Sequence, residues 1–376
     1  MVDLTRLTPQ SPLDFSPPAR PRATVLVTGY RQAPHLLDCL RSLALRPPST
    51  HFELKIFLNE PTPSLTEQIG QMVSGVDLLT SPVNVGFAGA CNGAAAGIES
   101  DYLVLLNDDA VAEPGWLDRL VEAADADPEA GAVGGKILSP EGAPREDGTV
   151  LWSDGTVTLV DDYSIARPAP PPVVRWADYC SAASLLVRRM AWEEVGGFDE
   201  GYYPAYYEDV DLCLKLQDRG WHVLYQPASV IRHRQGSSTS LRYRQFLRDR
   251  NKERLCARWP RALADRPPPA RHDPRAIAQA MRRAGERLPS VGQGPRAPDE
   301  HPPAAPDDEA WYRERQQEIE RAFTAVLETD RRNAPRWWWT RAADAGVAGF
   351  KQLLRHHWPA AHRALARRTT GWSPPS

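Results

Sequence analysis

The feature that most constrains this chain is a regular alternation of short β-rich runs and helical stretches between Ala23 and about Trp259. Apolar, β-branched runs indicate strands, and a helical segment follows each of them. The predicted elements, in chain order, are strand 24–28, helix 35–45, strand 52–58, helix 64–73, strand 76–79, helix 88–98 and strand 102–106. This alternation predicts an α/β domain with a mostly parallel sheet. Its ligand should lie outside the carboxyl ends of the strands.

Proline and charge divide the 376 residues into regions around this domain. Stretches rich in proline, arginine and alanine are typical of linkers. The predicted regions are a flexible lead at 1–22, the α/β domain at 23–259, a Pro/Arg-rich linker at 260–307 with one helix near 274–287, and a basic, tryptophan-rich helical region at 308–376 with helices at 308–327 and 335–368.

Composition excludes several classes of protein. A hydrophobic content of 42% with 25% charged residues describes a folded chain rather than a disordered or membrane-embedded one. The net charge of −3 argues against a nucleic-acid partner. Five widely spaced cysteines indicate neither a disulfide scaffold nor a zinc site, and there is no run of signal-peptide or membrane-span length. We therefore expect a cytoplasmic protein.

Asn107-Asp108-Asp109 is the first candidate for chemistry, because it directly follows the predicted strand 102–106. Carboxylates at that position would point toward the ligand and could hold Mg²⁺ or Mn²⁺, with diphosphate oxygens completing the shell. The same residues would also suit an N-terminal cap for a helix starting near Pro114. The residues alone leave both interpretations open.

Glu208-Asp209-Val210-Asp211 is the second candidate, at the start of a predicted helix over 210–219. Acidic residues suit a helix N-terminus, so capping alone explains them. The preceding aromatic cluster favours a sugar site, because flat rings can stack on a sugar while a carboxylate takes a proton from a hydroxyl. A tyrosine cluster also serves ordinary core packing. The cluster is Tyr202, Tyr203, Tyr206 and Tyr207.

His233 and the segment 84–93 (NVGFAGACNG) complete the candidates. As a neutral imidazole, His233 could complete a metal site begun by Asp109, with Arg232 and Arg234 facing phosphates. A lone histidine is also common on surfaces and in cores. The glycines of 84–93 permit close approach of a ligand to the backbone near a helix N-terminus, and tight helix packing explains them equally well.

In this order, the features resemble the family-2 inverting glycosyltransferases of the GT-A fold, particularly the rhamnosyltransferase-like and galactofuranosyltransferase-like branches. The resemblance covers about two thirds of the chain. It implies a Rossmann-like nucleotide-binding sheet with a mixed-sheet acceptor half, followed by a C-terminal helical appendage. The motifs that carry it are TVLVTGY at 24–30, NVGFAGACNGA at 84–94, LVLLNDDAVAEPGWL at 103–117, LLVRRMAWEEVGGFDEGYYPAYYEDVDLCLKLQDRGW at 185–221 and HRQGSS at 233–238.

The resemblance implies a role for individual residues. Asp109 and His233 would hold the metal, and Asp209, with Glu208 beside it, would be the catalytic base. The acceptor-binding candidates are Tyr203, Tyr206, Tyr207 and Trp176. The donor-binding candidates are Thr28, Tyr30, Asn59, Asn84, Gly86, Gly89, Asn92, Asn107 and Asp108. The implied partners are a nucleoside-diphosphate sugar and a hydroxyl-bearing acceptor.

The chain departs from the family pattern at Leu58-Asn59, where members commonly have Asp-Asn. Leu58 cannot accept the hydrogen bond by which that aspartate reads a pyrimidine base. Either Glu60 or the backbone reads the base, or the donor carries a different base. The usual Tyr-Asn after the first strand is also altered, to Gly29-Tyr30-Arg31.

The predicted function is therefore an inverting, metal-assisted sugar transfer, and two alternatives stand beside it. A sugar nucleotidyltransferase would want a glycine-rich, basic loop after the first strand, where GYRQAPH has one glycine and one arginine. A non-catalytic sugar- or nucleotide-binding partner of another transferase would not need Asp109, Asp209 and His233 together.

The C-terminal residues 331–376 carry nine lysines and arginines against one acid, Asp344. Basic residues among tryptophans are typical of a helix lying on an anionic membrane surface, here the inner face of the cell membrane. The alternative is a helical cap that packs on the catalytic domain or across a homodimer. The tryptophans concerned are Trp337, Trp338, Trp339, Trp358 and Trp372.

Overall fold

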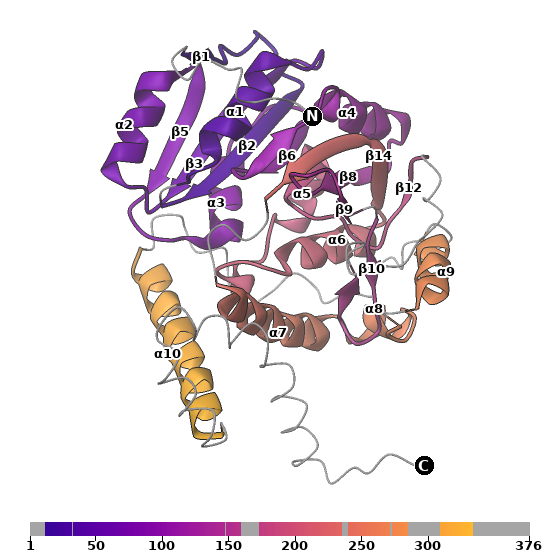
Figure 1. Ribbon diagram of the computed structural model, residues 1–376. Helices are drawn as coiled ribbons and strands as arrows, with labels where there is room; N and C mark the ends of the chain where they lie inside the picture. The colour runs from indigo at the N-terminus through magenta and orange to yellow at the C-terminus, as the bar shows by residue number, and fades with distance from the viewer. Residues whose placement is uncertain are drawn as a thin grey trace, which may run out of the picture. The chain divides into compact units, whose positions relative to one another are not determined.

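The computed structural model describes residues 12–31, 33–146, 148–158, 173–234, 240–270, 273–284 and 309–333 (Figure 1). The strands are β1 (Leu13–Asp14), β2 (Ala23–Tyr30), β3 (Phe52–Asn59), β4 (Val73–Ser74), β5 (Val76–Ser81), β6 (Tyr102–Asn107), β7 (Ala110–Ala112), β8 (Ala130–Leu138), β9 (Pro144–Glu146), β10 (Val150–Leu151), β11 (Val157–Thr158), β12 (Arg175–Trp176), β13 (Ser184–Arg188) and β14 (His222–His233). The helices are α1 (Leu36–Leu45), α2 (Pro63–Met72), α3 (Gly86–Ala95), α4 (Trp116–Ala126), α5 (Arg189–Val195), the 3₁₀ turn η3 (Glu200–Tyr202), α6 (Glu208–Asp218), α7 (Leu241–Arg258), α8 (Pro260–Ala264), α9 (Pro274–Ala284) and α10 (Glu309–Asn333).

A central sheet with the strand order β12-β14-β8-β13-β6-β2-β3-β5 organises this part of the chain. The four strands β5, β3, β2 and β6 are parallel to one another. Seven of the eight residues of β2 are buried, as expected for a strand that is covered on both faces. The parallel half predicted from the alternation is therefore confirmed.

The other half of the sheet is mixed. Strand β13 runs antiparallel to both β6 and β8, while β14 runs parallel to β8. The pairing of Ser184 with Leu106 places the start of β13 beside the carboxyl end of β6. Because β14 points the same way as β6, its last residue, His233, reaches the same edge of the sheet. The α/β fold with a mixed half is as expected.

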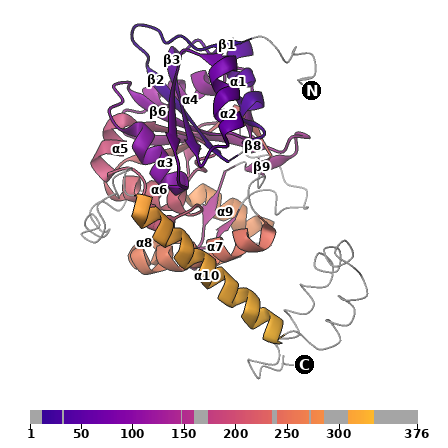
Figure 2. The same cartoon turned by 90° about the vertical axis from the view of Figure 1, so that its left-hand side faces the viewer.

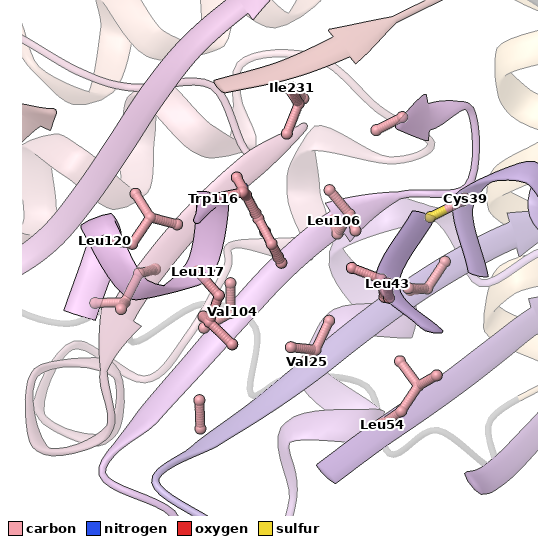
Figure 3. Close-up of a cluster of buried hydrophobic side chains, with 14 of the residues drawn as sticks. Val25, Cys39, Leu43, Leu54, Val104, Leu106, Trp116, Leu117, Leu120 and Ile231 are labelled. Atoms are coloured by element: carbon pink, nitrogen blue, oxygen red, sulfur yellow. The ribbon is translucent and has the colours of Figure 1, made fainter. Parts of the chain in front are cut away.

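The largest core lies between the sheet and helices α1, α2 and α4 (Figure 3). Val25 and Val104, on neighbouring strands, are fully buried there with Leu40 of α1 and Leu120 of α4. Each such side chain contributes about 1.5–3 kcal/mol to folding. Helices α3, α5 and α6 cover the other face (Figure 2). The ends of the strands are thus fixed by packing on both faces.

Part of the predicted flexible lead belongs to the fold. Strand β1 pairs in parallel with β4, and Leu13 and Phe15 are buried in the main core. The Phe15 ring meets the Phe52 ring edge-on, with 6.4 Å between centroids. Two apolar side chains are enough to seat this short segment, although it shows no periodicity that a sequence pattern could reveal. Residues 1–11 lie outside the described part of the chain.

Helices α8 and α9 lie within the range predicted as linker. Ile277 and Ala280 of α9 are buried with Val150 and Trp152 in a small separate core. The proline-rich composition of this segment therefore coexists with packing, because the fully buried Trp152 lies in one core with residues of α9. The predicted helix near 274–287 corresponds to α9.

The chain divides into two compact units, residues 1–316 and 317–376, and the sheet belongs to the first. Of the second unit, the structure describes the portion of α10 from 317 to 333. The predicted helix 308–327 is present within α10, whereas 335–368 and its tryptophans lie outside the described residues. Among the described helices, none combines the length and apolarity needed to cross a bilayer.

Candidate active site

The carboxyl ends of β2, β6 and β14 bring the predicted metal motif together. Thr28 near the end of β2 pairs with Asn107 at the end of β6. His233 at the end of β14 pairs with Ala110 of β7, just beyond Asp109. Backbone pairing between strands therefore places Asn107, Asp109 and His233 side by side, although 124 residues of chain separate Asp109 from His233.

Asp109 and His233 are in direct contact. The Nε2 atom of His233 lies 2.8 Å from Oδ1 of Asp109 and 3.2 Å from Nδ2 of Asn107. The Asp109 and His233 side chains are only 7% and 9% exposed. The other ring nitrogen of His233, Nδ1, is buried without a hydrogen-bond partner among the described residues. A carboxylate oxygen and an imidazole nitrogen thus lie at a spacing at which one ion could reach both.

Negative charge is concentrated at this edge. Burial raises the pKa of Asp108 to about 7, and the neighbouring charge of Asp109 acts in the same direction. A bound cation would offset the negative charge of these carboxylates. A site rich in oxygen ligands with one imidazole suits Mg²⁺ or Mn²⁺. Arg232, considered above for phosphate contact, forms an ion pair with Glu113 and donates to the carbonyl of Pro140.

The acidic pair Glu208-Asp209 opens α6 directly after a strained turn. Tyr206 and Tyr207 have φ angles of +80° and +74°, a region that costs a residue with a side chain about 1–3 kcal/mol. Asn251 of α7 holds this turn, because its Nδ2 donates to the carbonyls of Tyr202, Ala205 and Tyr206 at 2.9, 3.0 and 2.8 Å. Asn251 is completely buried. It fixes the direction in which α6 starts.

Asp209 is connected to the strand ends through two consecutive residues. Its Oδ2 accepts a hydrogen bond from the amide of Ala182 at 3.3 Å, and Oδ1 accepts one from the amide of Val210 at 2.9 Å. The carbonyl of Ala183 in turn accepts from the amide of Asn107 at 3.1 Å. The acidic pair on α6 and the acidic motif after β6 are therefore parts of one site.

The two carboxyl groups of the pair have different environments. Burial raises the pKa of Asp209, opposed by the hydrogen bonds from Ala182 and Val210 and by the positive charge of Arg248. Burial, reinforced by the charge of Asp209, raises the pKa of Glu208 further, well above the usual range. Oε2 of Glu208 is buried without a hydrogen-bond partner among the described residues. Residue Asp209 is half-buried, whereas Glu208 is buried.

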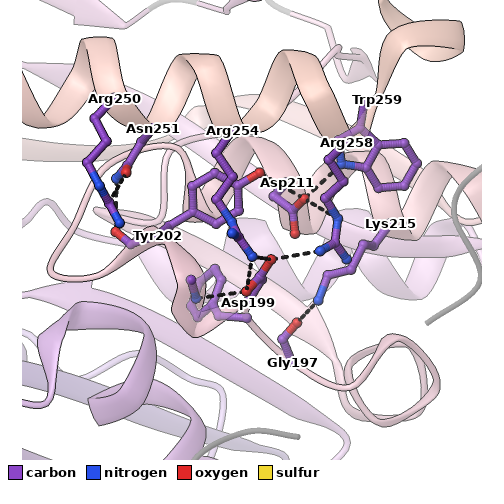
Figure 4. A network of polar contacts seen from close by, with 12 residues as sticks. Gly197, Asp199, Tyr202, Asp211, Lys215, Arg250, Asn251, Arg254, Arg258 and Trp259 are labelled. Carbon is purple, nitrogen blue, oxygen red and sulfur yellow. Dashed lines mark hydrogen bonds and ion pairs between the residues drawn. The ribbon is translucent and has the colours of Figure 1, made fainter. Parts of the chain in front are cut away.

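A buried charge network behind the acidic pair joins α6 to α7 (Figure 4). Asp211 is fully buried, and its Oδ1 accepts from Nε1 of Trp259 at 2.7 Å and lies 3.0 Å from Nε of Arg258. Oδ2 of Asp199 lies 2.7 Å from Nη1 of Arg258 and 2.9 Å from Nη2 of Arg254. Replacing Asp211 would remove one of the two carboxylates that pair with the largely buried guanidinium of Arg258. Sequence reasoning missed this network, because nothing in the spacing of Asp211 and Arg258 indicates that they meet.

Arg248 is a second residue that sequence reasoning missed. Its guanidinium lies 6.0 Å from the centroid of the Tyr206 ring, and its charge acts on both Asp209 and Tyr207. It therefore supplies positive charge near the acidic pair. Six arginines occur along α7, and no pattern in the sequence singles out this one.

Several donor-binding candidates lie where the end of β3 contacts the start of α3. Asn59 donates from Nδ2 to the carbonyl of Gly86 at 3.2 Å and accepts from the amide of Val85 at 2.9 Å. Asn84 accepts from the amide of Gly86 at 2.9 Å. Gly86 has φ +74°, and a Cβ there would lie 2.9 Å from the carbonyl oxygen of Pro204. Leu58 is fully buried.

Gly89 and Asn92 lie farther along α3 and have protein partners. Asn92 donates to the carbonyl of Phe198 at 3.0 Å and to Oε1 of Glu200 at 2.9 Å, and it accepts from the amide of Phe198 at 2.9 Å. A Cβ at Gly89 would lie 2.7 Å from the hydroxyl of Tyr312. Donor binding by these two residues stays a prediction. Tyr30, at the end of β2, stacks with Arg31, whose guanidinium lies 5.0 Å from the ring centroid.

The acceptor-binding candidates divide into two groups. Tyr206 and Tyr207 belong to the turn beside Asp209, and Tyr203 is buried, donating from its hydroxyl to the carbonyl of Asn84 at 3.0 Å. Trp176 differs, because it pairs with Leu224, nine residues before His233 on the same strand. Because β14 bulges between Gln226 and Val230, the β8 partners of Leu224 and Arg232 are only five residues apart, Val133 and Leu138, which is on the order of 17 Å. Trp176 thus lies toward the other end of β14 from His233, and a role for it in acceptor binding stays a prediction.

Fold and site together define the class of protein. The architecture is that of a glycosyltransferase of the GT-A fold. It has a parallel half-sheet of the kind that binds nucleotides, a mixed second half, and acidic residues where the two halves join. Residues 21–251 match the family described as "Glycosyltransferase like family 2", and the chain belongs to this family. The chain is thus a glycosyltransferase, in agreement with the prediction from sequence and against the nucleotidyltransferase alternative.

Named relatives include rhamnosyltransferases. The chain is 31% identical over 243 residues to "N-acetylglucosaminyl-diphospho-decaprenol L-rhamnosyltransferase" of Mycobacterium tuberculosis, covering 57% of this chain and 76% of that protein. It is 31% identical over 228 residues to "O-antigen biosynthesis protein RfbC" of Myxococcus xanthus, covering 58% and 18%. A solved structure, GalNAc-T7 with UDP, GalNAc and Mn²⁺, superposes with a TM-score of 0.50 at 14% identity, over 66% of this chain and 50% of that chain. The last likeness concerns the fold alone.

Proposed function

We propose that this glycosyltransferase moves a sugar from a nucleoside-diphosphate sugar to an acceptor hydroxyl with inversion of configuration. Asp209 is the general base, and a divalent cation is held by Asp109 and His233. The observation that carries the proposal is the link through Ala182 and Ala183, which brings Asp209 to the carboxyl end of β6. A base at that position lies next to the residues suited to bind the diphosphate and its cation.

The residues at the strand ends fit a divalent cation. The 2.8 Å contact between Asp109 and His233 supplies an oxygen and a nitrogen ligand, and burial together with the charge of Asp109 raises the pKa of the adjacent Asp108. When bound, the cation would offset the charge that develops on the departing diphosphate. A structure of the same fold contains UDP and Mn²⁺, which agrees with a nucleotide and a divalent cation bound together. Both Mg²⁺ and Mn²⁺ suit the donor set.

Asp209 acts on the acceptor. Its carboxylate is oriented by the amides of Ala182 and Val210, and it takes the proton of the acceptor hydroxyl as that oxygen attacks the anomeric carbon. The bond from the anomeric carbon to the diphosphate oxygen breaks on the opposite side, so configuration inverts. Burial and the charge of Asp209 raise the pKa of the neighbouring Glu208, which favours its neutral form beside the base.

The relatives' names suggest which substrates to try first. A rhamnosyl nucleotide is the first donor and a prenyl-diphosphate saccharide the first acceptor, because one named relative joins these two chemistries. The nucleobase is open, since Leu58 is buried and Glu60 lies 3.3 Å from Arg31 in an ion pair. Contact of the C-terminal residues with an anionic membrane, or with a second copy, remains a prediction for residues outside the described part.

A thermal-shift panel tests the proposal. The protein is mixed with UDP, GDP, dTDP, ADP and CDP, and with their common sugar conjugates, each with MnCl₂, with MgCl₂ or with EDTA. We expect at least one nucleoside diphosphate to raise the melting temperature with a divalent cation and not with EDTA, because ligands of the folded state stabilise it. The selected donor should then be consumed. No shift from any nucleotide with either cation would contradict the proposal.

A further inference from the structure

Tyr312, in the first turns of α10, lies beyond the part of the chain that matches the family and yet is buried in the first unit. Its side chain is 1% exposed. Its hydroxyl donates to Oε2 of Glu200 at 2.6 Å. A phenol that is wholly buried against a carboxylate shows that the start of α10 is seated in the catalytic unit.

The phenol of Tyr312 packs closely against residues of α3 and of the segment that contains Glu200. A glycine at position 89 leaves room for it, since a Cβ there would lie 2.7 Å from the Tyr312 hydroxyl. The Tyr203 ring lies 6.1 Å from the Tyr312 ring between centroids, at 39°. Glu200 is held from the other side by Asn92, whose Nδ2 lies 2.9 Å from Oε1. Contacts within the protein thus explain the glycine at position 89 and the asparagine at position 92 of α3.

Glu200 belongs to the segment that leads to the catalytic base. It opens the turn η3, and its carbonyl accepts from the amide of Tyr203 at 3.0 Å. The next residue, Pro204, accepts at its carbonyl from the amide of Phe87 at 2.8 Å. The strained turn at 206–207 follows at once, and then Asp209. Fixing Glu200 therefore fixes one end of the segment whose other end carries the base.

We propose that Tyr312 is a positioning residue for Asp209: its hydroxyl holds Glu200 and thereby fixes segment 197–207 against α3. The proposal rests on the assignment of Asp209 as the base. It gives the start of α10 a part in the reaction, although α10 lies outside the residues that match the family.

The test compares Tyr312→Phe with Arg313→Ala in the full-length chain. Phenylalanine keeps the ring and removes only the hydroxyl, whereas Arg313 forms an exposed ion pair with Glu309 one turn away and serves as the matched control. With the donor selected by the thermal-shift panel, kcat of Tyr312→Phe should fall about tenfold or more, because small misplacements of reacting groups are costly. The KM for the donor should stay within about twofold, and Arg313→Ala should match the wild type.

Two further measurements separate positioning from a general loss of stability. Glu200→Ala combined with Tyr312→Phe should be no slower than the slower single variant, because both changes remove the same hydrogen bond. Amide hydrogen exchange of segment 197–208 and of Phe87 should quicken in Tyr312→Phe while strands β2 and β6 keep their protection. Unchanged kcat in an active preparation, additive effects, or unchanged exchange would each overturn the proposal. Wild-type inactivity would instead refute the proposed function, and exchange would still decide on Tyr312.

Discussion

At the strand ends, Asn107, Asp109 and His233 are placed by backbone pairing within the sheet, whereas Asp209 is placed by side chains of elements distant in sequence. The first group needs only the registers of β2, β6, β7 and β14. The second depends on Asn251 for the turn before α6 and on the network around Asp211 behind it. One half of the site is thus built by strands, and the other half is held by helix α7.

Because the two halves of the site are held differently, substitutions in them should have different effects. Damage to the strand-borne half should weaken binding of the donor and its cation, because those side chains would contact the ligand directly. Damage to the helix-borne half should slow the chemical step or lower stability, because the base has to be held in place by buried polar contacts. Variants in the two halves can therefore test the assignment of roles.

The largest effect is expected from Asp209→Asn. The amide keeps the shape and can no longer take a proton, so turnover should fall by about a thousandfold. Donor affinity, measured by calorimetry, should change less than about twofold. Asp218→Asn at the other end of α6 is the matched control and should retain turnover. A variant Asp209→Asn that keeps most of its activity would remove Asp209 from the role of base.

Asp109→Ala should have the next largest effect, and on binding rather than on the base. Removing the carboxylate beside His233 should weaken Mn²⁺-dependent donor binding at least about tenfold. Titration calorimetry with a nucleoside diphosphate, with and without Mn²⁺, measures this. Donor affinity that is unchanged in the presence of Mn²⁺ would show that Asp109 is not a ligand.

Asn251→Ala should lower the free energy of unfolding by about 3 kcal/mol, because three carbonyls that share one buried donor lose it. Urea denaturation followed by circular dichroism measures the change. Arg119→Ala, which removes an exposed ion pair with Glu122, should cost less than about 0.5 kcal/mol. Equal effects of the two substitutions would mean that the turn before α6 does not depend on Asn251.

The smallest effect concerns pH. Burial raises the pKa of Asp209, so its protonated, inactive form persists to a higher pH than for an ordinary aspartate. The acidic limb of kcat/KM should therefore lie above the usual pKa of an aspartate, with activity gained as pH rises through it. A pH–rate profile measured with saturating Mn²⁺ tests this. A limb at or below the ordinary value would contradict the burial of the base.

Sequence predicted the strand-borne half better than the helix-borne half, for a physical reason. The run Tyr102–Asn107 and the acids after it are local signals, and parallel strands bring their ends together by topology. The seating of Tyr312 against Gly89 depends on a long-range contact that no periodicity encodes. The position of Trp176 along β14 could not be predicted either, because the register of β12 on β14 cannot be derived from composition. Phe15 in the lead was missed for the same kind of reason.

The most direct test of the central claim is the stereochemistry of transfer. If Asp209 removes the acceptor proton in a single displacement, a donor of α configuration should give a β-linked product, read from the coupling of the anomeric proton by nuclear magnetic resonance. The measurement uses the donor selected by the thermal-shift panel and a short reaction time, so that the product does not equilibrate. A product whose anomeric configuration is opposite to that of the selected donor is the result predicted here. A product with the same configuration as the donor would mean that the configuration is retained, and would contradict the role of Asp209 as the base of an inverting reaction.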